Sequence, residues 1–179
     1  RHIVLPAPLY GEVIEVDERL AADGTVTRAL DEQAARSAFE DAFARGWRAL
    51  AIVLMHAYRS GDHERRLGAI AREVGFTQVT LSHEASPLMK IVGRGDTTVV
   101  DAYLSPILRR YVERVSARTG DARLMFMQSN GGLVDAHRFQ GKDAILSGPA
   151  GGVVGAVKTA ALAGFERIIG FDMGGTSTD

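Results

Sequence analysis

Residues 170–179, GFDMGGTSTD, hold the groups that a phosphate and magnesium site requires. Asp172 follows the apolar run RIIGF and is predicted at the end of a strand, where a carboxylate meets a ligand or a metal-bound water. Gly174 and Gly175 permit a tight turn whose backbone N–H groups approach phosphate oxygens without an intervening Cβ. A plain β-turn is the alternative, but hydroxyls and a second carboxylate favour a phosphate and Mg²⁺ site: Thr176, Ser177, Thr178 and Asp179.

A second glycine-rich segment, SGPAGGVVGA at 147–156, is predicted between a short strand and a helix. The start of a helix has N–H groups without intrahelical partners and the positive end of the helix dipole, so glycines there let an anion approach. The spacing is neither Gly-x-Gly-x-x-Gly nor a P-loop. Tight packing of the helix on a strand would also explain these glycines. The shorter QSNGG at 128–132 is typical of an ordinary turn.

Three residues of the first half could ligate zinc or iron: His56, His63 and Glu64. We favour a structural role for them, because His63 and Glu64 fall in the first turn of a predicted helix, where Glu64 complements the dipole. Nothing supplies a convincing set of further ligands. The segment Ser82–Glu84 is likewise predicted to begin a helix, and no serine has the Gly-x-Ser-x-Gly setting of a nucleophile.

The start of the chain is predicted to form a small β element followed by a helix. Apolar and polar residues alternate over 13–16, a turn follows at Asp23-Gly24, and the strand pattern resumes at Val26. Asp31 is predicted to cap a helix that Gly46 ends, because apolar residues recur at helical spacing between them.

The elements that follow predict an α/β fold with a parallel sheet. An apolar strand at 49–55 leads to a helix that Asp62 caps and Gly75 ends, and the strand 76–82 comes next. Apolar strands joined by amphipathic helices are typical of a parallel sheet covered on both faces. The sequence therefore predicts a βαβ unit.

The second half is predicted to supply the strands and turns that carry the glycine-rich segments. A helix over 97–119 contains Pro106, which should kink or divide it. The segment 122–132 is predicted to be a strand ending in an Asn-Gly-Gly turn. A short strand before Ser147, a helix closed by Gly164 and a last strand at 167–172 complete the pattern, and this last strand would leave a sheet edge open.

The composition is that of an ordinary globular chain of 179 residues, with a net charge of −1 and no cysteine. No run of five or six Lys or Arg is present, so nucleic acid is not an expected partner. The longest apolar stretches fall far short of the roughly 20 residues that cross a bilayer, so a membrane is not expected either. A chain without disulfides or thiolate metal sites fits a reducing compartment, and we expect the cytoplasm.

Three blocks in series resemble the hydantoinase A/5-oxoprolinase family: RLMFMQSNGGL, ILSGPAGGVVGA and IGFDMGGTSTD. The upstream segments EVDERL, HAYRSGDHE and DTTVVDAYLSP are similar to that family as well. The resemblance implies ATP-dependent opening of cyclic amides such as hydantoins and 5-oxoproline, or the related role of an ATP-dependent ketone carboxylase subunit. It also implies a fold of the actin, hexokinase and acetate kinase type, in which two α/β domains clamp the nucleotide.

The resemblance further implies that the chain is a middle fragment. Residues 1–96 would be the later part of the first domain, 97–120 the connecting helices, and 121–179 the truncated start of the second, nucleotide-binding domain. Only one Asp-x-Gly-Gly-Thr loop is present, which corresponds to the family's second, so the first would precede Arg1. One departure is KIVGRGDTTVV, where the family is more acidic before the arginine that matches Arg94.

By resemblance, the cofactors are ATP and Mg²⁺, and the glycine-rich segments hold them. Asp172 and Asp179 would be catalytic and would bind Mg²⁺ or its waters. Contacts to the nucleotide would come from Gly174, Gly175, Thr176, Ser177, Thr178, Ser147, Gly148, Gly151 and Gly152. The role of the first half would be scaffolding.

The expected partners are a cyclic amide substrate and a subunit or domain of the hydantoinase B type, and association with a second copy is left open. The isolated fragment is expected to be inactive. An alternative from another functional class also stays open: an actin-like domain that binds ATP as a sensor or assembly protein and does not turn it over.

Overall fold

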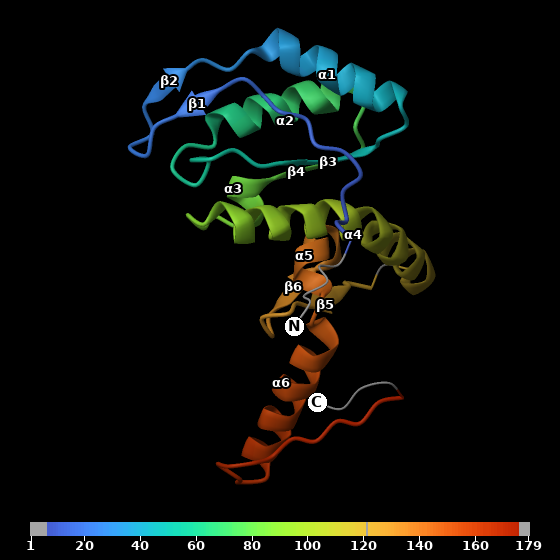
Figure 1. Cartoon of the computed structure of the whole chain (residues 1–179). Coiled ribbons are helices and arrows are strands. Elements are labelled where there is room, and N and C mark those ends of the chain that lie inside the picture. The colour runs from blue at the N-terminus through green and yellow to red at the C-terminus, as the bar shows by residue number, and fades with distance from the viewer. Residues whose placement is uncertain (1–6, 121, 176–179) are drawn as a thin grey trace. The chain divides into compact units, whose positions relative to one another are not determined.

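The computed structural model describes residues 7–120 and 122–175 of the chain and divides it into two compact units, Arg1–Ile107 and Leu108–Asp179. The first unit contains β1 (Arg19–Leu20), β2 (Val26–Arg28), α1 (Glu32–Ala44), β3 (Ala49–Ile52), α2 (Asp62–Val74), β4 (Gln78–Leu81) and α3 (Ser82–Ala85). Helix α4 (Ile91–Thr119) begins in the first unit and ends in the second (Figure 1).

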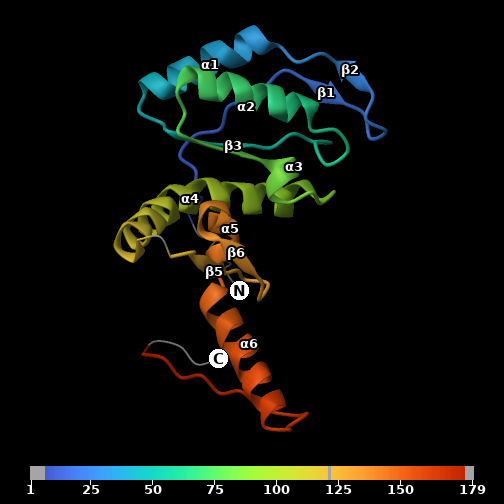
Figure 2. The ribbon, with the colours of Figure 1, turned by 180° about the vertical axis from the view of Figure 1, so that it is seen from behind.

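The first unit is built on the predicted βαβ unit. Strands β3 and β4 are parallel, with Ala49 opposite Gln78 and Ile52 opposite Leu81, and α2 connects them. Helices α1 and α2 lie together on one side of this strand pair, and the first part of α4 lies on the other (Figures 1 and 2). Their facing apolar residues form one core: Ala35, Phe39, Ala42, Ile52, Leu67, Ile70, Ala71, Phe76 and Leu81.

The predicted hairpin at the start of the chain forms, but it is shorter than the pattern indicated. Strands β1 and β2 pair antiparallel, and Gly24 in the turn between them has a φ of +94°, which favours glycine. The Asp23 carboxylate accepts a hydrogen bond from the Thr25 N–H at 2.9 Å, as turn aspartates do. Residues 13–16 are not a strand.

Local capping rules place most helix ends correctly. Asp31 caps α1, because its carboxylate accepts the Ala34 N–H at 2.9 Å. Gly75, with a φ of +120°, ends α2. The predicted cap at Asp62 is wrong by one residue: Gly61 is the N-cap and Asp62 is the first helical residue. The Asp62 carboxylate is bonded instead to Ser60 and Arg65, at 2.9 and 2.6 Å.

Helix α4 is longer than the sequence predicted and is not divided by Pro106, which lies inside it. It begins at Ile91 rather than Thr97, since Arg94 in its first turn is fixed by contacts to other segments. The Thr98 hydroxyl, which is fully buried, donates a 2.6 Å hydrogen bond to the Arg94 carbonyl within the same helix.

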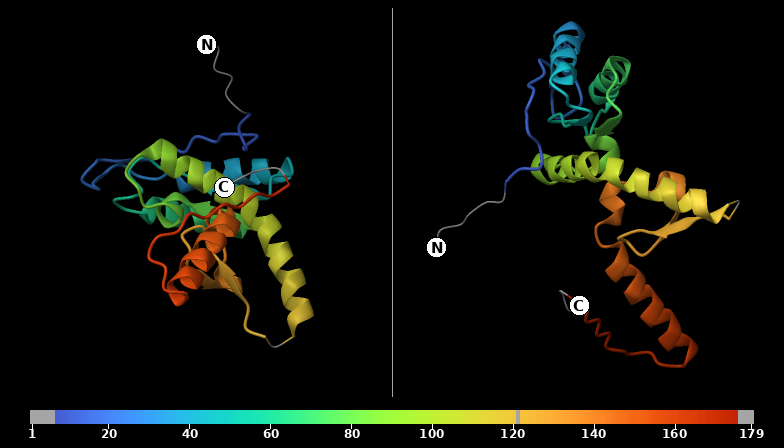
Figure 3. Two further views of the ribbon diagram at one scale, coloured as in Figure 1. Left: turned by 90° about the horizontal axis from the view of Figure 1, so that it is seen from below. Right: turned by 90° about the vertical axis from the view of Figure 1, so that its right-hand side faces the viewer.

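The second unit is a hairpin followed by short helices and one longer one (Figure 3). Strands β5 (Met125–Met127) and β6 (Leu133–Asp135) pair antiparallel, and the predicted Asn-Gly-Gly turn joins them. The 3₁₀ helix η1 (Ala136–Arg138) and the helices α5 (Gly141–Ala144) and α6 (Ser147–Leu162) follow. The Phe126 ring stacks on Phe139, with centroids 5.1 Å apart.

Two strand predictions in the second unit are wrong. Residues 143–146 belong to α5 and the link to α6 rather than to a strand, and the glycine-rich run from Ser147 is already helical. Residues 165–172 are irregular, and Ile169 and Phe171 are 99% and 74% exposed. Strand formation requires a neighbouring strand with free backbone groups, and the described residues offer none beside this segment.

Within the described ranges, no helix combines the length and the apolar character needed to cross a bilayer. The predicted domain boundaries, at 96/97 and 120/121, stay predictions.

Candidate functional site

The two glycine-rich segments at 128–132 and 147–156 come together in the second unit. The Ser129 hydroxyl donates to the Asp143 carbonyl at 2.7 Å and accepts the Leu146 N–H at 3.0 Å. A Cβ on Gly131 would lie 3.1 Å from the Val154 side chain, so the hairpin turn packs directly on α6. QSNGG is therefore part of the structure that supports the start of this helix, in addition to being a turn.

The start of α6 has the features of an anion site on its open side. Leu146 is the N-cap and gives no side-chain cap, and the first turn has no acidic residue. A Cβ on Gly151 would lie 3.7 Å from Met127, whereas positions 148 and 152 have no other atoms within 4 Å. The first N–H groups of a helix lack intrahelical partners and can bind an anion, but the predicted contacts of this segment to a nucleotide stay a prediction.

The third predicted segment is described only in part. Asp172, Gly174 and Gly175 are exposed, and nothing lies within 4 Å of a Cβ placed on Gly175. Thr176, Ser177, Thr178 and Asp179 lie outside the described residues. Within the described part of the chain, no hydrogen bond links Asp172–Gly175 to the start of α6, and no group of three His, Asp or Glu side chains could hold a metal ion.

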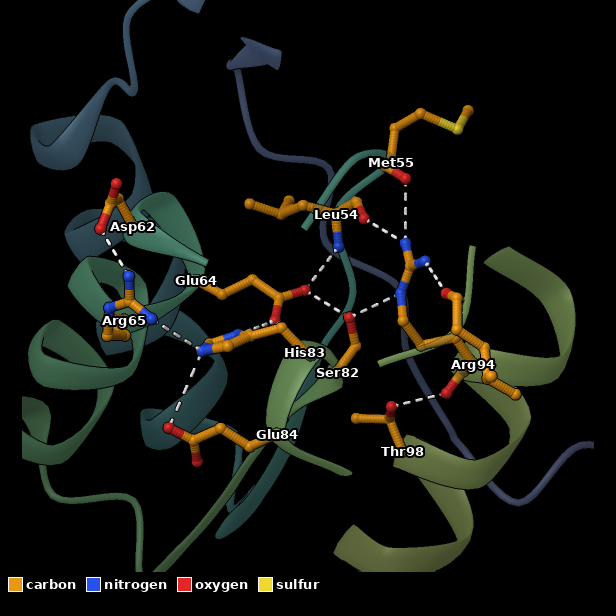
Figure 4. Close-up of polar contacts among 11 residues, drawn as sticks. Leu54, Met55, Asp62, Glu64, Arg65, Ser82, His83, Glu84, Arg94 and Thr98 are labelled. Atoms are coloured by element: carbon orange, nitrogen blue, oxygen red, sulfur yellow. Dashed lines mark hydrogen bonds and ion pairs between the residues drawn. The ribbon is translucent and has the colours of Figure 1, made fainter. Parts of the chain in front are cut away.

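A buried polar network in the first unit was not predicted from the sequence. Glu64 lies in the first turn of α2, as expected, but its side chain is fully buried and points toward the ends of β3 and β4 (Figure 4). Its carboxylate accepts four hydrogen bonds: from the Leu54 N–H at 2.9 Å, Ser82 Oγ at 2.6 Å, the His83 N–H at 3.0 Å and His83 Nδ1 at 2.7 Å. Glu64 therefore has these buried contacts in addition to the place in the first helical turn that the sequence predicted.

Arg94 is the buried cation of the same network. Its Nε donates to Ser82 Oγ at 2.9 Å, so one hydroxyl joins this guanidinium to the Glu64 carboxylate. Its remaining four N–H donors are directed at four carbonyls: Leu88 (2.6 Å), Met89 (3.2 Å), Leu54 (2.5 Å) and Met55 (3.0 Å). A fully buried charge is tolerated because each of its polar atoms is satisfied.

The three predicted metal-ligand candidates are not brought together. His63 contacts the Glu18 carboxylate at 2.7 Å, whereas Glu64 faces His83. His56 packs edge-on against Tyr58, and its Nδ1 is buried without a hydrogen-bond partner in the described structure. The structural role that we favoured for His63 and Glu64 agrees with these contacts.

The network lies at the carboxyl ends of β3 and β4, since Leu54 follows β3 and Ser82 follows β4. This edge is where parallel sheets commonly bind ligands. One signal in the sequence could have pointed to it: Arg94 is a cation near the start of a helix, where the dipole disfavours positive charge.

Two family models match the chain. Residues 1–75 match the hydantoinase/oxoprolinase N-terminal region, and residues 94–179 match hydantoinase/oxoprolinase. The 5-oxoprolinase of Saccharomyces cerevisiae is 40% identical over 96% of this chain and 16% of the relative. The caprolactamase subunit alpha of Pseudomonas jessenii is 35% identical over 99% of this chain and 26% of the relative.

Two solved structures share the fold. The ATP-dependent caprolactamase from Pseudomonas jessenii superposes with a TM-score of 0.82 and 34% identity, over 91% of this chain and 25% of that one. The nucleotide-free acetone carboxylase superposes with a TM-score of 0.78 and 30% identity, over 91% of this chain and 24% of that one. The chain spans about 16% of the length of the 5-oxoprolinases that it matches. Since the two models account for most of the sequence, the chain belongs to the hydantoinase/oxoprolinase family.

Proposed function

We propose that this chain is a segment of an ATP-dependent hydrolase that opens cyclic amides. The observation that carries the proposal is the match to the ATP-dependent caprolactamase, with a TM-score of 0.82 over 91% of the chain. Caprolactam and 5-oxoproline, which the names of its relatives indicate as substrates, are both cyclic amides. The complete fold would be of the actin and hexokinase type, with the second unit opening its nucleotide-binding domain.

The chemistry of this reaction explains the need for ATP. An amide carbonyl is a poor electrophile because its nitrogen donates electrons into it, and transfer of a phosphoryl group to the oxygen creates a leaving group that water can displace. The protein's contribution is to position the phosphates and neutralise their charge. The open glycine positions at the start of α6 support this role, since a Cβ-free helix start lets phosphate oxygens reach backbone N–H groups.

The magnesium site is a further part of the proposal. Asp172 and Asp179 would hold Mg²⁺ or its waters, and Gly174, Gly175 and the hydroxyls of Thr176, Ser177 and Thr178 would contact phosphate oxygens. Asp172 is exposed. One or two carboxylates together with phosphate oxygens form a common Mg²⁺ site.

The proposal is tested by comparing two valine substitutions in α6 of the full-length protein. Gly148 lies in the first turn and Gly155 about two turns further on, and both have open space around a Cβ. Gly148→Val should weaken Mg-ATP binding about tenfold or more, because the new side chain blocks the backbone donors. Gly155→Val should leave binding unchanged. Equal affinities in both variants would remove α6 from the nucleotide site.

Turnover is tested separately with a panel of cyclic amides. Hydrolysis of ATP by the full-length protein should be stimulated by one cyclic amide and lost in Asp172→Ala. If ATP binds but no cyclic amide stimulates hydrolysis, the assignment as an amide hydrolase fails.

A ketone carboxylase is the second candidate, and the match to acetone carboxylase, with 30% identity and a TM-score of 0.78, favours it. Stimulation of ATP hydrolysis by a ketone with bicarbonate, and not by cyclic amides, would select it. Either enzyme would work with a partner subunit of the hydantoinase B type, because the caprolactamase relative is a subunit alpha. Co-purification of the full-length protein with such a partner subunit tests this expectation.

A further inference from the structure

We propose that Asn130 is a site of spontaneous deamidation and that the turn of residues 128–132, between β5 and β6, sets the rate of this reaction. Asn130 is the single asparagine of the chain, and Gly131 follows it. An asparagine side-chain amide is attacked by the backbone nitrogen of the next residue, and glycine obstructs this attack least because it has no Cβ. The reaction consumes only water, so the inference goes beyond the proposed function and is independent of it.

The reaction is balanced by water and ammonia. The Gly131 backbone nitrogen loses its proton and bonds to Asn130 Cγ, the bond from Cγ to Nδ2 breaks, and ammonia leaves with that proton. Water then opens the cyclic imide. Cleavage of the new bond between Cγ and the Gly131 nitrogen gives aspartate. Cleavage of the original main-chain bond gives isoaspartate, whose backbone runs through the former side chain.

The reacting amide is accessible to solvent. Asn130 is exposed in the turn, and Gly131 after it has a φ of +81°, which favours glycine. Asn130 Oδ1 accepts the Gly132 N–H at 2.8 Å, a bond that keeps the side-chain amide beside the backbone of its own turn. Water can therefore reach this amide in the folded protein.

The same turn restrains the nucleophile. The Gly131 N–H donates to the Gln128 carbonyl at 2.9 Å, so its proton is directed at a carbonyl rather than at water. The Gln128 N–H in turn donates to the Gly132 carbonyl at 2.8 Å and closes the turn. Because the Gly131 nitrogen must lose its proton and approach Cγ, its hydrogen bond has to open first. The rate of deamidation should therefore follow the local opening of this turn.

Contacts to α5 and α6 keep the turn closed. The Asp143 carbonyl accepts both the N–H and the hydroxyl of Ser129, each at 2.7 Å. Ser129 Oγ also accepts the Leu146 N–H at 3.0 Å. A Cβ on Gly131 would lie 3.1 Å from the Val154 side chain, so the turn has little spare space beside α6. Opening of the turn loosens these contacts, and the reaction at Asn130 reports on them.

The two products should affect the turn differently. Aspartate keeps the length of the backbone, and its carboxylate can accept the Gly132 N–H as the amide oxygen does. Isoaspartate adds a methylene group to the main chain and leaves the former main-chain carbonyl as a free carboxylate. The hydrogen bonds between Gln128, Gly131 and Gly132 then lose their register. We therefore expect isoaspartate, and not aspartate, to detach Ser129 from the start of α6.

Peptide mapping of the full-length protein, aged in mildly alkaline buffer, tests the proposal. Trypsin cleaves after Arg123 and Arg138 and releases residues 124–138, in which Asn130 is the single asparagine. Chromatography and mass spectrometry separate the amide from its two acid products. We expect slow conversion in the folded protein and conversion about tenfold faster or more in urea, where the turn is open. No conversion in the folded protein, or equal rates with and without urea, would overturn the proposal.

Two serine variants test the contribution of α5 and α6. Ser129→Ala should speed conversion in the folded protein about tenfold, because it removes the hydrogen bonds of the hydroxyl to Asp143 and Leu146. Ser60→Ala removes a hydroxyl that is bonded to the exposed Asp62 in the first unit and should leave the rate unchanged. Equal rates in the two variants would contradict the inference. The comparison with urea uses the unaltered protein, so it decides the question even if Ser129→Ala does not fold.

Hydrogen exchange at the Leu146 amide tests the effect on α6, since this N–H donates to Ser129 Oγ. Protein aged until most of its 124–138 peptide carries isoaspartate should exchange this amide about tenfold faster than fresh protein. Asn130→Asp, which has the other product at the same position, should exchange it at the rate of fresh protein. Equal exchange in aged protein and in Asn130→Asp would overturn the stated effect on the start of α6.

Discussion

The two units differ in which polar and apolar residues they bury. In the first, even charged side chains are buried, because Glu64 and Arg94 have a partner for each polar atom. In the second, α6 is a largely apolar helix with no buried residue, and Val153, Val157 and Leu162 are 64%, 53% and 91% exposed. Whether a side chain is buried therefore depends on the surface that faces it rather than on its residue type.

The consequence for stability is that the first unit should carry most of it. Its core cluster joins α1, α2, β3 and β4, whereas α6, among the described residues, packs mainly on the hairpin turn and β5. Buried apolar area stabilises at roughly 25 cal/mol per Å², so exposed residues contribute little whatever their hydrophobicity. Substitutions in the two units should therefore differ in size.

The largest effect is expected for Arg94→Met. The substitution leaves four carbonyls and the Ser82–Glu64 pair without their donor, and the loss of one partner of a buried pair costs about 3–5 kcal/mol. Urea unfolding followed by fluorescence of Trp47, the single tryptophan, measures it within the first unit. Arg36→Met, at an exposed arginine that pairs with Glu73, is the control and should change little. Similar losses in both variants would contradict a special role for the buried network.

Leu67→Ala should have the next largest effect. Leu67 is fully buried in the core, so the substitution should lower the free energy of unfolding by about 2–5 kcal/mol. Val153→Ala in α6 should change the free energy of unfolding by less than about 0.5 kcal/mol. Thermal unfolding of the two variants compares the units directly. A loss at Val153 as large as that at Leu67 would show that α6 is packed in solution.

Substitutions at the helix caps should show a smaller difference between the two units. Asp31→Ala removes the side-chain cap of α1 and should cost about 1 kcal/mol. Leu146→Ala, at the N-cap of α6, removes no side-chain hydrogen bond and should cost less. Urea unfolding of both variants checks the order, which would be reversed if the leucine side chain were a packing residue.

The smallest effect concerns pH at the surface of the first unit. The hydrogen bond from Arg65, with a second from Ser60, lowers the pKa of Asp62 below its ordinary value of 3.8. Because the folded-state pKa is the lower one, this contribution is present above about pH 4 and is lost as the pH falls through the folded-state pKa. Nuclear magnetic resonance of the Arg65 guanidinium should show its release in acid, and Asp62→Asn should remove that transition. A transition unchanged in Asp62→Asn would assign the titration to another group.

Local patterns predicted the local features of the fold. The caps at Asp31 and Gly75, the turn at Asp23-Gly24 and the parallel βαβ unit depend on residues close in sequence, and each is present. The strand predicted at 167–172 failed because an apolar run has no fixed structure until a neighbouring strand lies beside it.

The candidate sites were predictable only where glycine and hydroxyl residues cluster along the chain. The contact between Ser129 and the start of α6 joins two such clusters, although no pattern along the chain predicts that they lie together. The Glu64 network was missed because its members are separated, with Ser82 at 18 residues from Glu64 and Leu54 at 40 from Arg94. No periodicity marks a charge whose partners come from other elements.

The long reach of Arg94 also has a consequence for synthesis of the chain. The ribosome makes the Leu54 carbonyl 40 residues before the guanidinium that binds it. At roughly 5–20 residues per second, about 2–8 seconds pass between them. During that interval the Leu54 and Met55 carbonyls lack the guanidinium that binds them, so the buried network of the first unit cannot be completed until the first turn of α4 has emerged.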